Sequence, residues 1–318
     1  MIDRASGLAR RDREARSSSS SKENTVSEPI SRERLAQVTG RTDVGEKPSP
    51  ARVYSCALGG EHYYAVDKNF VEKQVAANPD YLHILRSNRG AVGRVVEYAN
   101  REHGITQFVD IGSGLPTEGS VHEVSDEIAP GQCAVAYVDN EQIAVAHSEI
   151  LLSQSADPSR HHAVYANFLE TEQLWDQIMA KEIIQPDRPI CLMLMALVHF
   201  IPDEANPEAA LAFYRDVLPR GSLLAISHIT FEEPANPDED DKEVLARWRE
   251  TVQAYTKTTT AAHFRSRERI RGFLGDFEVV EEPDWTSHWR IPDPSVLPEE
   301  YRTKPWRSQV LVEVGKKP

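Results

Sequence analysis

Hydrophobic and polar positions follow a helical period over the first structured part of the chain. Residues 51–60 lead into a helical stretch from Val66 to Ala77, which Asn78-Pro79 interrupts. A longer helix then follows, because its apolar residues recur at spacings of three, four and seven. Gly104 closes it, as glycine commonly does at a helix C-terminus. The apolar positions of this helix are Leu82, Leu85, Val92, Val95, Val96 and Ala99.

Beyond Gly104, short runs rich in β-forming residues alternate with helical patterns. Such alternation predicts the α/β class, with a mostly parallel sheet and helices on both of its faces. The segment from Glu282 to Trp306 is rich in Pro and Trp and has no helical pattern, which suits a last strand inserted antiparallel. We expect seven strands, at residues 107–111, 134–138, 163–165, 190–195, 223–228, 277–280 and 309–314.

Residues 1–48 show no hydrophobic periodicity. They are rich in Ser, Arg and Glu and include five consecutive serines from Ser17 to Ser21. Such a composition cannot bury enough apolar surface to fold, so we predict a disordered tail. A short helix from Arg32 to Val38 that docks on a partner is the alternative.

Composition narrows the classes of function. The formal net charge is −14, and an acidic protein is a poor match for nucleic acid, whose binding depends on Lys and Arg. No apolar run approaches the roughly 18 residues of a membrane helix, and no signal peptide is visible. Cys56, Cys133 and Cys191 form no Cys-x-x-Cys pair, so we expect no disulfide framework and no metal site. We therefore expect a cytoplasmic protein without nucleic-acid or membrane partners, and its oligomeric state is left open.

A glycine loop carries the strongest chemical signal. Phe108 to Ile111 reads as a buried strand, and Gly112-Ser113-Gly114 then turns the chain and lets a ligand approach the backbone. The next strand ends in Asp139-Asn140, and an acidic residue there can accept hydrogen bonds from both ribose hydroxyls. The pattern predicts a nucleoside-binding site.

Two kinds of nucleoside ligand compete for this loop. A dinucleotide requires a third glycine, but Thr117 stands at that position and Pro116 lies inside the loop. Asp110 would also repel a phosphate, whereas it suits a ligand that carries an ammonium and a sulfonium cation. These observations favour S-adenosylmethionine as the cofactor.

Further candidates follow the other strands. Asn167 and Phe168 end the third strand, where the adenine normally lies, and Ala196 follows the fourth. His199 is the best-placed general base at that edge of the sheet, with a structural hydrogen bond to a loop carbonyl as the alternative. His228 ends the fifth strand, where a structural role is favoured.

The chain resembles bacterial S-adenosylmethionine-dependent methyltransferases whose substrates are mostly unassigned. The resemblance covers roughly residues 50–315 and is most specific at residues 107–117, 121–124, 137–140, 197–203 and 221–228. It implies a Rossmann-like sheet, an N-terminal helical cap at 49–104 and an S-adenosylmethionine-binding domain at 105–318. It also implies that the segment containing Gly59 and Gly60 caps the cofactor, and that Glu123, a second candidate base, lies beside the glycine loop. Tyr54, Tyr63 and Tyr64 are expected either to line an acceptor pocket or to pack within the cap.

The chain departs from the family pattern at three positions. Ser55 and Asn167 stand where we expect acidic residues, and Lys68 stands where we expect Arg. The leading hypothesis is methyl transfer to a small molecule in secondary metabolism. A second hypothesis keeps the fold but replaces methyl transfer by intramolecular substitution or cyclisation with a carboxylate base, and a third is a non-catalytic binding protein.

Three features outside the motifs also give expectations. The segment from Pro234 to Asp241 is expected to help shape the acceptor pocket. Its acidic run from Asp238 is interpreted as a solvated loop, with a metal site as the alternative. Four alternating arginines on a predicted helix are expected to be surface charges: Arg265, Arg267, Arg269 and Arg271.

Overall fold

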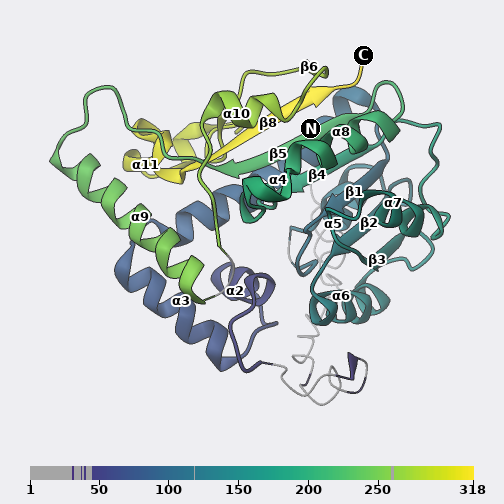
Figure 1. Ribbon diagram of the computed structural model, residues 1–318, viewed down its shortest axis with the longest axis horizontal. Helices are drawn as coiled ribbons and strands as arrows, with labels where there is room; N and C mark the ends of the chain where they lie inside the picture. The colour runs from purple at the N-terminus through teal and green to yellow at the C-terminus, as the bar shows by residue number, and fades with distance from the viewer. Residues whose placement is uncertain (1–30, 32–36, 38, 41–44, 118, 259–260) are drawn as a thin grey trace, which may run out of the picture.

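Apolar runs buried on both faces form the central sheet (Figure 1). The computed structural model describes residues 31, 37, 39–40, 45–117, 119–258 and 261–318, so the predicted tail lies almost entirely outside the described residues. Because helices cover both faces, the inner strands read as continuous apolar sequence. The strands are β1 (Gln107–Ile111), β2 (Ala134–Asp139), β3 (His161–Tyr165), β4 (Cys191–Met195), β5 (Leu223–Ile229), β6 (Glu278–Val279), β7 (Asp284–Trp285) and β8 (Val310–Lys316).

The strands follow the order β3-β2-β1-β4-β5-β8-β6, and β7 also pairs with β8. The first five strands along the chain run parallel, and β8 lies antiparallel to β5, β6 and β7. The predicted α/β class and the antiparallel last strand are therefore confirmed. The predicted number of strands is wrong, because the described residues form eight strands. The additional strand, β7, has two residues and is too short to produce an alternating pattern.

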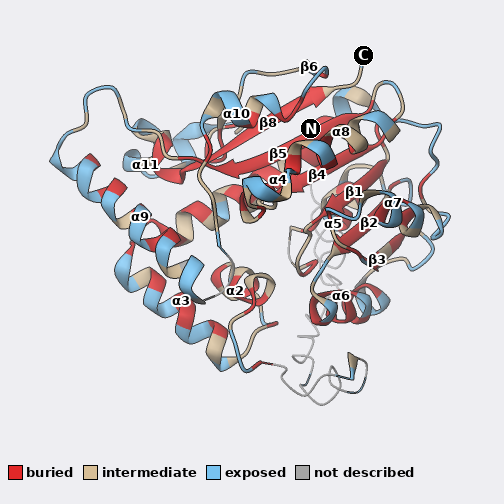
Figure 2. Cartoon of the chain, viewed as in Figure 1, coloured by how far each residue is buried: buried red, intermediate tan, exposed pale blue. Residues whose placement is uncertain are grey.

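Helices form a layer on each side of the sheet. One layer contains α4 (Tyr81–His103), α5 (Val121–Ile128) and α6 (Gln142–Ser155), and the other contains α7 (Thr171–Met179) and α8 (Pro207–Val217). Successive side chains of a strand point to opposite faces. Phe108 accordingly packs with α4, whereas Val109 packs with α7 and α8. Figure 2 shows the sheet buried between these layers, with the exposed residues on the outer faces of the helices.

The remaining elements lie at the edges of these layers. The Pro- and Trp-rich connection contains helical turns that the sequence pattern did not predict, since none exceeds five residues. In the part of the chain that the structure describes, no helix is long and apolar enough to cross a membrane. The elements are α2 (Pro50–Ala57), α3 (Ala65–Ala77), η1 (Val198–Phe200), η2 (Asp203–Ala205), α9 (Glu239–Thr258), α10 (Arg267–Gly272), η3 (Pro294–Val296), α11 (Glu299–Thr303) and η4 (Pro305–Ser308).

The N-terminal helices stand beside the sheet, where α2 and α3 pack on the first half of α4 and α9 packs on α3 (Figure 1). A buried ion pair between Arg52 of α2 and Asp67 of α3, 2.8 Å long, fixes the first two helices to one another. The second half of α4, from Ala91 to Ala99, contributes to the core beneath the sheet. The helix α4 thus belongs both to the N-terminal helical region and to the α/β domain. The domain boundary at residue 104 stays a prediction.

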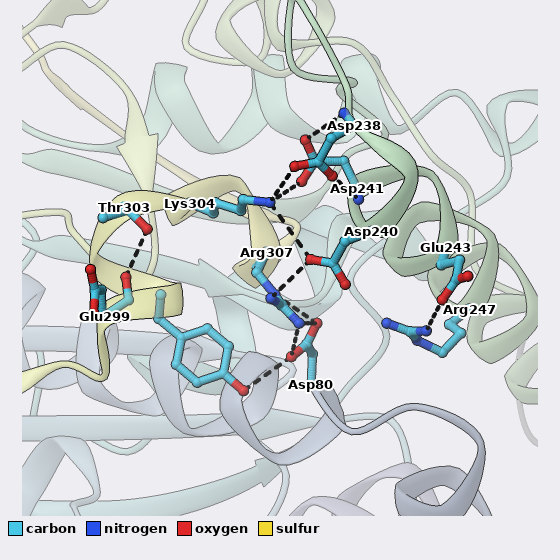
Figure 3. Close-up of polar contacts among 11 residues, drawn as sticks. Asp80, Asp238, Asp240, Asp241, Glu243, Arg247, Glu299, Thr303, Lys304 and Arg307 are labelled. Carbon is cyan, nitrogen blue, oxygen red and sulfur yellow. Dashed lines mark hydrogen bonds and ion pairs between the residues drawn. The ribbon is translucent and has the colours of Figure 1, made fainter.

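The interpretation of the acidic run from Asp238 as a solvated loop is wrong for residues 239–241, which form the first turn of α9. A lysine pairs with the carboxylates of this run (Figure 3). Lys304 Nζ lies 2.6 Å from Asp241, 3.3 Å from Asp238 and 3.6 Å from Asp240. Asp238 and Asp241 also accept each other's backbone N–H groups, which is an N-terminal cap for α9. The ammonium group stands among the carboxylates, so this run is one side of an ion-pair cluster.

The same cluster holds the start of α4. Arg307 donates two hydrogen bonds of 3.0 Å to the buried carboxylate of Asp80, and Tyr301 donates a third of 3.0 Å (Figure 3). The ring of Tyr301 stacks on His83 at 3.5 Å between centroids. Residues from the C-terminal segment therefore join α9 to the N-terminal end of α4.

Candidate active site

A cavity of about 700 Å³ opens at the carboxyl edge of the sheet, between the strand ends and the helices α2, α4 and α9. Ligands of open α/β sheets bind at this edge, where the strand order reverses between β1 and β4. Of the residues named from the sequence, the cavity is lined by Tyr54, Asp110, Gly112, Ser113, Gly114, Asp139, Asn140, Asn167, Phe168, Ala196 and His199.

The glycine loop is tied to the end of β2. The N–H groups of Gly112 and Ser113 donate to Val138 O at 2.7 and 3.1 Å, and the N–H of Gly114 donates to Asp139 Oδ2 at 2.9 Å. Gly112 has a φ of +76°, and a Cβ there would lie 2.7 Å from Leu197 Cδ1. A side chain at this position would meet both backbone strain and a steric clash, so glycine is required.

Two opposite charges face the cavity beside this loop. Asp110 is buried, and burial, only partly offset by the nearby Arg89, raises its pKa to about 7. The Nε of Arg89 is buried and has no hydrogen-bond partner among the described residues. Within the described residues no ion pair within 4 Å joins the two side chains. A zwitterion with an ammonium and a carboxylate would satisfy both.

Asp139 is half-buried, and desolvation of its carboxyl group raises its pKa although backbone N–H groups donate to it. Its two oxygens accept from Gly114 N and Glu141 N, both at 2.9 Å. A carboxylate oxygen has more than one acceptor direction, so both oxygens retain capacity for further donors. This side chain thus orders the loop and can still bind hydroxyl groups.

A chain of buried hydrogen bonds runs along the floor between α2 and β5. Tyr54 OH donates to Leu85 O at 3.0 Å and accepts from Asn88 Nδ2 at 2.9 Å. Ser227 Oγ donates to Asn88 Oδ1 at 2.6 Å and accepts from Ala196 N at 2.8 Å. Ala196 has a φ of +60°, a conformation that costs a non-glycine residue about 1–2 kcal/mol. This series of hydrogen bonds therefore stabilises the strained turn at the end of β4. It also means that the polar groups of Tyr54 and Asn88 are paired with other protein groups.

His199 lies on the turn η1 and is buried in the wall of the cavity. Its Nδ1 has no hydrogen-bond partner among the described residues, so no loop carbonyl holds that nitrogen. Burial, followed by the nearby His228 and Arg265, lowers its pKa well below the ordinary value. The imidazole is therefore neutral at pH 7 and can accept a proton.

Arg265 fixes the turn that carries His199. Its guanidinium donates to Val198 O at 2.9 Å, to Ile201 O at 2.7 Å and to Asp203 Oδ1 at 2.7 Å. It also lies 2.9 Å from the Nε2 of His228. The prediction of a surface charge is wrong for Arg265, which is 5% exposed, because its partners lie some 60 residues earlier in the chain.

His228 is buried below this turn, outside the residues that line the cavity. Its Nδ1 lies 2.6 Å from Ile229 O and donates to it, which leaves Nε2 to accept from Arg265. Both ring nitrogens are used in the protein interior, which agrees with the structural role favoured from the sequence.

Five residues named from the sequence or the resemblance lie elsewhere. Gly59 and Gly60, together with Tyr63 and Tyr64, are not among the lining residues. Glu123 is exposed on α5 and also does not line the cavity, and its carboxylate accepts from Gly119 N and Ser120 N at 2.8 and 3.3 Å. That carboxylate caps a helix, and the structure does not bring it to the other candidates.

The sequence reasoning missed two parts of the cavity. The segment from Pro234 to Asp241 does not line it, and α9 supplies Trp248, Thr251 and Val252 instead. Arg89, which lies in the long helix predicted from the sequence, was not assigned to the site. Its position could have been inferred from α4, because the lining residues of that helix form one stripe at spacings of three and four: Tyr81, Ile84, Leu85, Asn88, Arg89 and Val92.

Comparisons with known proteins agree with this geometry. A protein of the DUF574 family from Streptomyces avermitilis is 28% identical, with a TM-score of 0.73 over 87% of this chain and 100% of the other. A candidate methyltransferase from Thermobifida fusca is 26% identical, with a TM-score of 0.71 over 85% of this chain and 95% of the other. None of the curated proteins matches the chain. These findings give no support to the alternative of a methyltransferase fold without methyl transfer.

The family comparison covers almost all of the described structure. Residues 37–318 match the family model described as S-adenosyl methyltransferase. Three features fit the cofactor of that family, S-adenosylmethionine. They are the Nε of Arg89 without a hydrogen-bond partner, the buried carboxyl group of Asp110, and Gly112, where a side chain would not fit. The chain belongs to the S-adenosyl methyltransferase family.

Proposed function

We propose that the protein transfers the methyl group of S-adenosylmethionine to a small-molecule acceptor. The observation that carries this proposal is a pair of opposite charges, Asp110 and Arg89, that form no ion pair within 4 Å among the described residues and lie in a cavity that continues past the glycine loop to His199. Its volume of about 700 Å³ falls within the roughly 300–1,000 Å³ of small-molecule sites. Cofactor and acceptor share this space, so the acceptor is small.

Different polar side chains of the cavity bind different groups of the cofactor. Asp110 pairs with its ammonium group, Arg89 with its carboxylate, and Asp139 accepts hydrogen bonds from the ribose hydroxyls. Asn167 and Phe168 line the cavity at the end of β3, on the side of the adenine. Asn167 Oδ1 already accepts from Leu169 N at 3.1 Å, so its amide N–H groups are the ones free to donate.

His199 acts on the acceptor. S-adenosylmethionine supplies, when bound, an electrophilic methyl group whose bond to sulfur breaks with the electron pair left on sulfur. A lone pair of the acceptor forms the new bond to carbon, and the proton of the acceptor passes to the neutral imidazole of His199. A low pKa makes this imidazole a weak base, so its main contribution is to hold the acceptor in line as the proton leaves.

Calorimetry with S-adenosylmethionine and S-adenosylhomocysteine tests the proposal. We expect micromolar binding of both, and loss of that binding in Asp139→Ala and in Arg89→Leu. Asp187→Ala, at an exposed position outside the cavity, is the matched control and keeps the affinity. His199→Gln is also expected to bind S-adenosylhomocysteine normally, because it acts on the acceptor. Absence of binding to the unchanged protein would refute the proposal.

A cytoplasmic location, a role in secondary metabolism and the domain boundaries at residues 48 and 104 stay predictions from the sequence.

A further inference from the structure

The cavity extends beyond the cofactor residues toward β5 and β8. In the sheet, β5 and β8 lie on the far side of β4 from β1, β2 and β3, whose ends carry the cofactor residues. Ile229 ends β5 and pairs with Val310 at the start of β8, and both line the cavity. This second half of the cavity is available to the acceptor, so its walls determine which molecules are accepted.

Those walls are apolar. Ile84 of α4, Trp248 and Val252 of α9, Ile229 and Val310 belong to a single hydrophobic cluster, and each of them is at most 7% exposed. The indole of Trp248 donates to Thr230 O at 3.3 Å, which fixes its orientation in this cluster. The position of the ring is thus set by the protein before a ligand arrives.

Three polar side chains around this half, those of Thr251, Tyr54 and Asn88, are already paired. Thr251 Oγ1 donates to Arg247 O at 2.9 Å and accepts from Asn78 Nδ2 at 3.1 Å. Tyr54 and Asn88 use their polar atoms in the hydrogen-bond chain of the floor. A charged group placed here would lose its hydration without gaining a partner, which is strongly unfavourable.

Among the described lining residues, every charged side chain belongs to the cofactor half, where Arg89, Asp110, Asp139 and Glu141 lie. His199 stands at the junction of the two halves and is the group able to take a proton from an acceptor. The acceptor atom must lie near His199, while the body of the molecule lies against the cluster around Trp248.

We propose, on the basis of the function proposed above, that the acceptor is an uncharged, largely apolar molecule that presents one hydroxyl group to His199. Trp248 is the main determinant of this specificity. In the transfer, the hydroxyl oxygen forms the bond to the methyl carbon, the bond between carbon and sulfur breaks, and the hydroxyl proton passes to His199. Because the charged side chains line one half of the cavity and the apolar ones the other, the charged cofactor and the uncharged acceptor bind in opposite halves.

Binding of two matched probes tests the proposal. 1-Naphthol and naphthalene-1-sulfonate have the same ring system and differ in charge. Calorimetry is performed with each probe, with and without saturating S-adenosylhomocysteine. We expect 1-naphthol to bind at least tenfold more tightly than the sulfonate in both cases. Equal or tighter binding of the sulfonate, or absence of naphthol binding, would overturn the proposal.

Variants of α9 sharpen the test. Trp248→Leu is expected to weaken 1-naphthol about tenfold through the loss of aromatic contact, with unchanged affinity for S-adenosylhomocysteine. Trp306→Leu makes the same change in a hydrophobic cluster outside the cavity and leaves both affinities unchanged. Val252→Lys places a cation in the wall and is expected to reverse the preference toward the sulfonate. Unchanged probe affinities in Trp248→Leu and Val252→Lys, with intact cofactor binding, would also overturn the proposal.

The two proposals fail differently. If S-adenosylhomocysteine does not bind, the proposed function is refuted, while the preference between the two probes in the cofactor-free protein still decides the nature of the apolar half. If S-adenosylhomocysteine binds and the probes show no preference for the uncharged molecule, only the acceptor class is refuted.

Discussion

Asp110→Asn is expected to stabilise the protein and abolish cofactor binding. The carboxyl group of Asp110 is buried at the end of β1, and its pKa is raised from 3.8 to about 7. Between these two values the folded protein keeps a proton that the unfolded chain has lost. The free energy of unfolding therefore falls as the pH rises from about 4 to 7, and above pH 7 the contribution of this group stays at its lowered value and no longer changes with pH.

The magnitude follows from the difference between the two pKa values. One pKa unit corresponds to 1.36 kcal/mol, so the shift from 3.8 to about 7 lowers the free energy of unfolding by about 4 kcal/mol between these two pH values. Asparagine has nearly the same shape and does not ionise. The stability of Asp110→Asn relative to the unchanged protein should therefore increase by about 3 kcal/mol between pH 5 and pH 8.

Urea denaturation at several pH values measures this difference, and equal m-values show that the same surface unfolds in both proteins. Subtracting the two curves removes every other titrating group. A difference that does not change between pH 5 and pH 8 would refute the assignment of a raised pKa to Asp110.

Glu313→Gln is the matched control. Glu313 is fully buried in β8, outside the lining of the cavity, and burial also raises its pKa to about 7. Its removal should give a pH dependence of the same sign without affecting binding of S-adenosylhomocysteine. For the unchanged protein, affinity should fall below pH 7, because protonated Asp110 cannot pair with an ammonium group. Retained affinity in Asp110→Asn would contradict the role that we assign to this carboxylate.

Three further predictions concern the surroundings of the site. Gly112→Ala is expected to destabilise the protein by about 2 kcal/mol more than Gly104→Ala, because both have positive φ but only the first meets a side chain at 2.7 Å; thermal unfolding compares them. Asp80→Asn should cost about 3 kcal/mol, because the buried Arg307 loses the carboxylate at 3.0 Å and keeps only that of Asp240 at 3.9 Å; an unfolding free energy within 1 kcal/mol of the original would refute this. Arg265→Lys should lower turnover by about 10- to 100-fold, since lysine cannot reproduce the guanidinium fork. Affinity for S-adenosylhomocysteine should not change in that variant, and equal losses of affinity and turnover would contradict a positioning role.

The half of the cavity that we propose for the cofactor could be predicted because its residues follow strands directly. Asp110, Gly112 and Asp139 each stand at or just beyond the end of a buried apolar run, and parallel strands bring such ends to one edge of the sheet. Local sequence and a general rule of topology are sufficient there. The same reasoning located Ala196 and His199 at the end of β4.

The acceptor half could not be predicted, because its residues come together through tertiary packing. Trp248 lies on a helix whose own pattern shows an apolar stripe but not what that stripe contacts. Arg265 occurs in a run of alternating arginines, and only its partners, which lie earlier in the chain, distinguish it from the other three, none of which is buried. A two-residue strand such as β7 carries no pattern at all.

The continuity of α4 has a consequence for the kinetics of ligand exchange. Its 23 residues form one uninterrupted helix, about 35 Å long, that is anchored in the core at one end and clamped through Asp80 at the other. The helices α2 and α3 pack on the first half of α4. They therefore cannot move away from the sheet as a unit unless α4 bends. Ligand exchange without bending of α4 therefore depends on smaller movements of the elements that line the cavity, so release of product, rather than the chemical step, is expected to limit turnover.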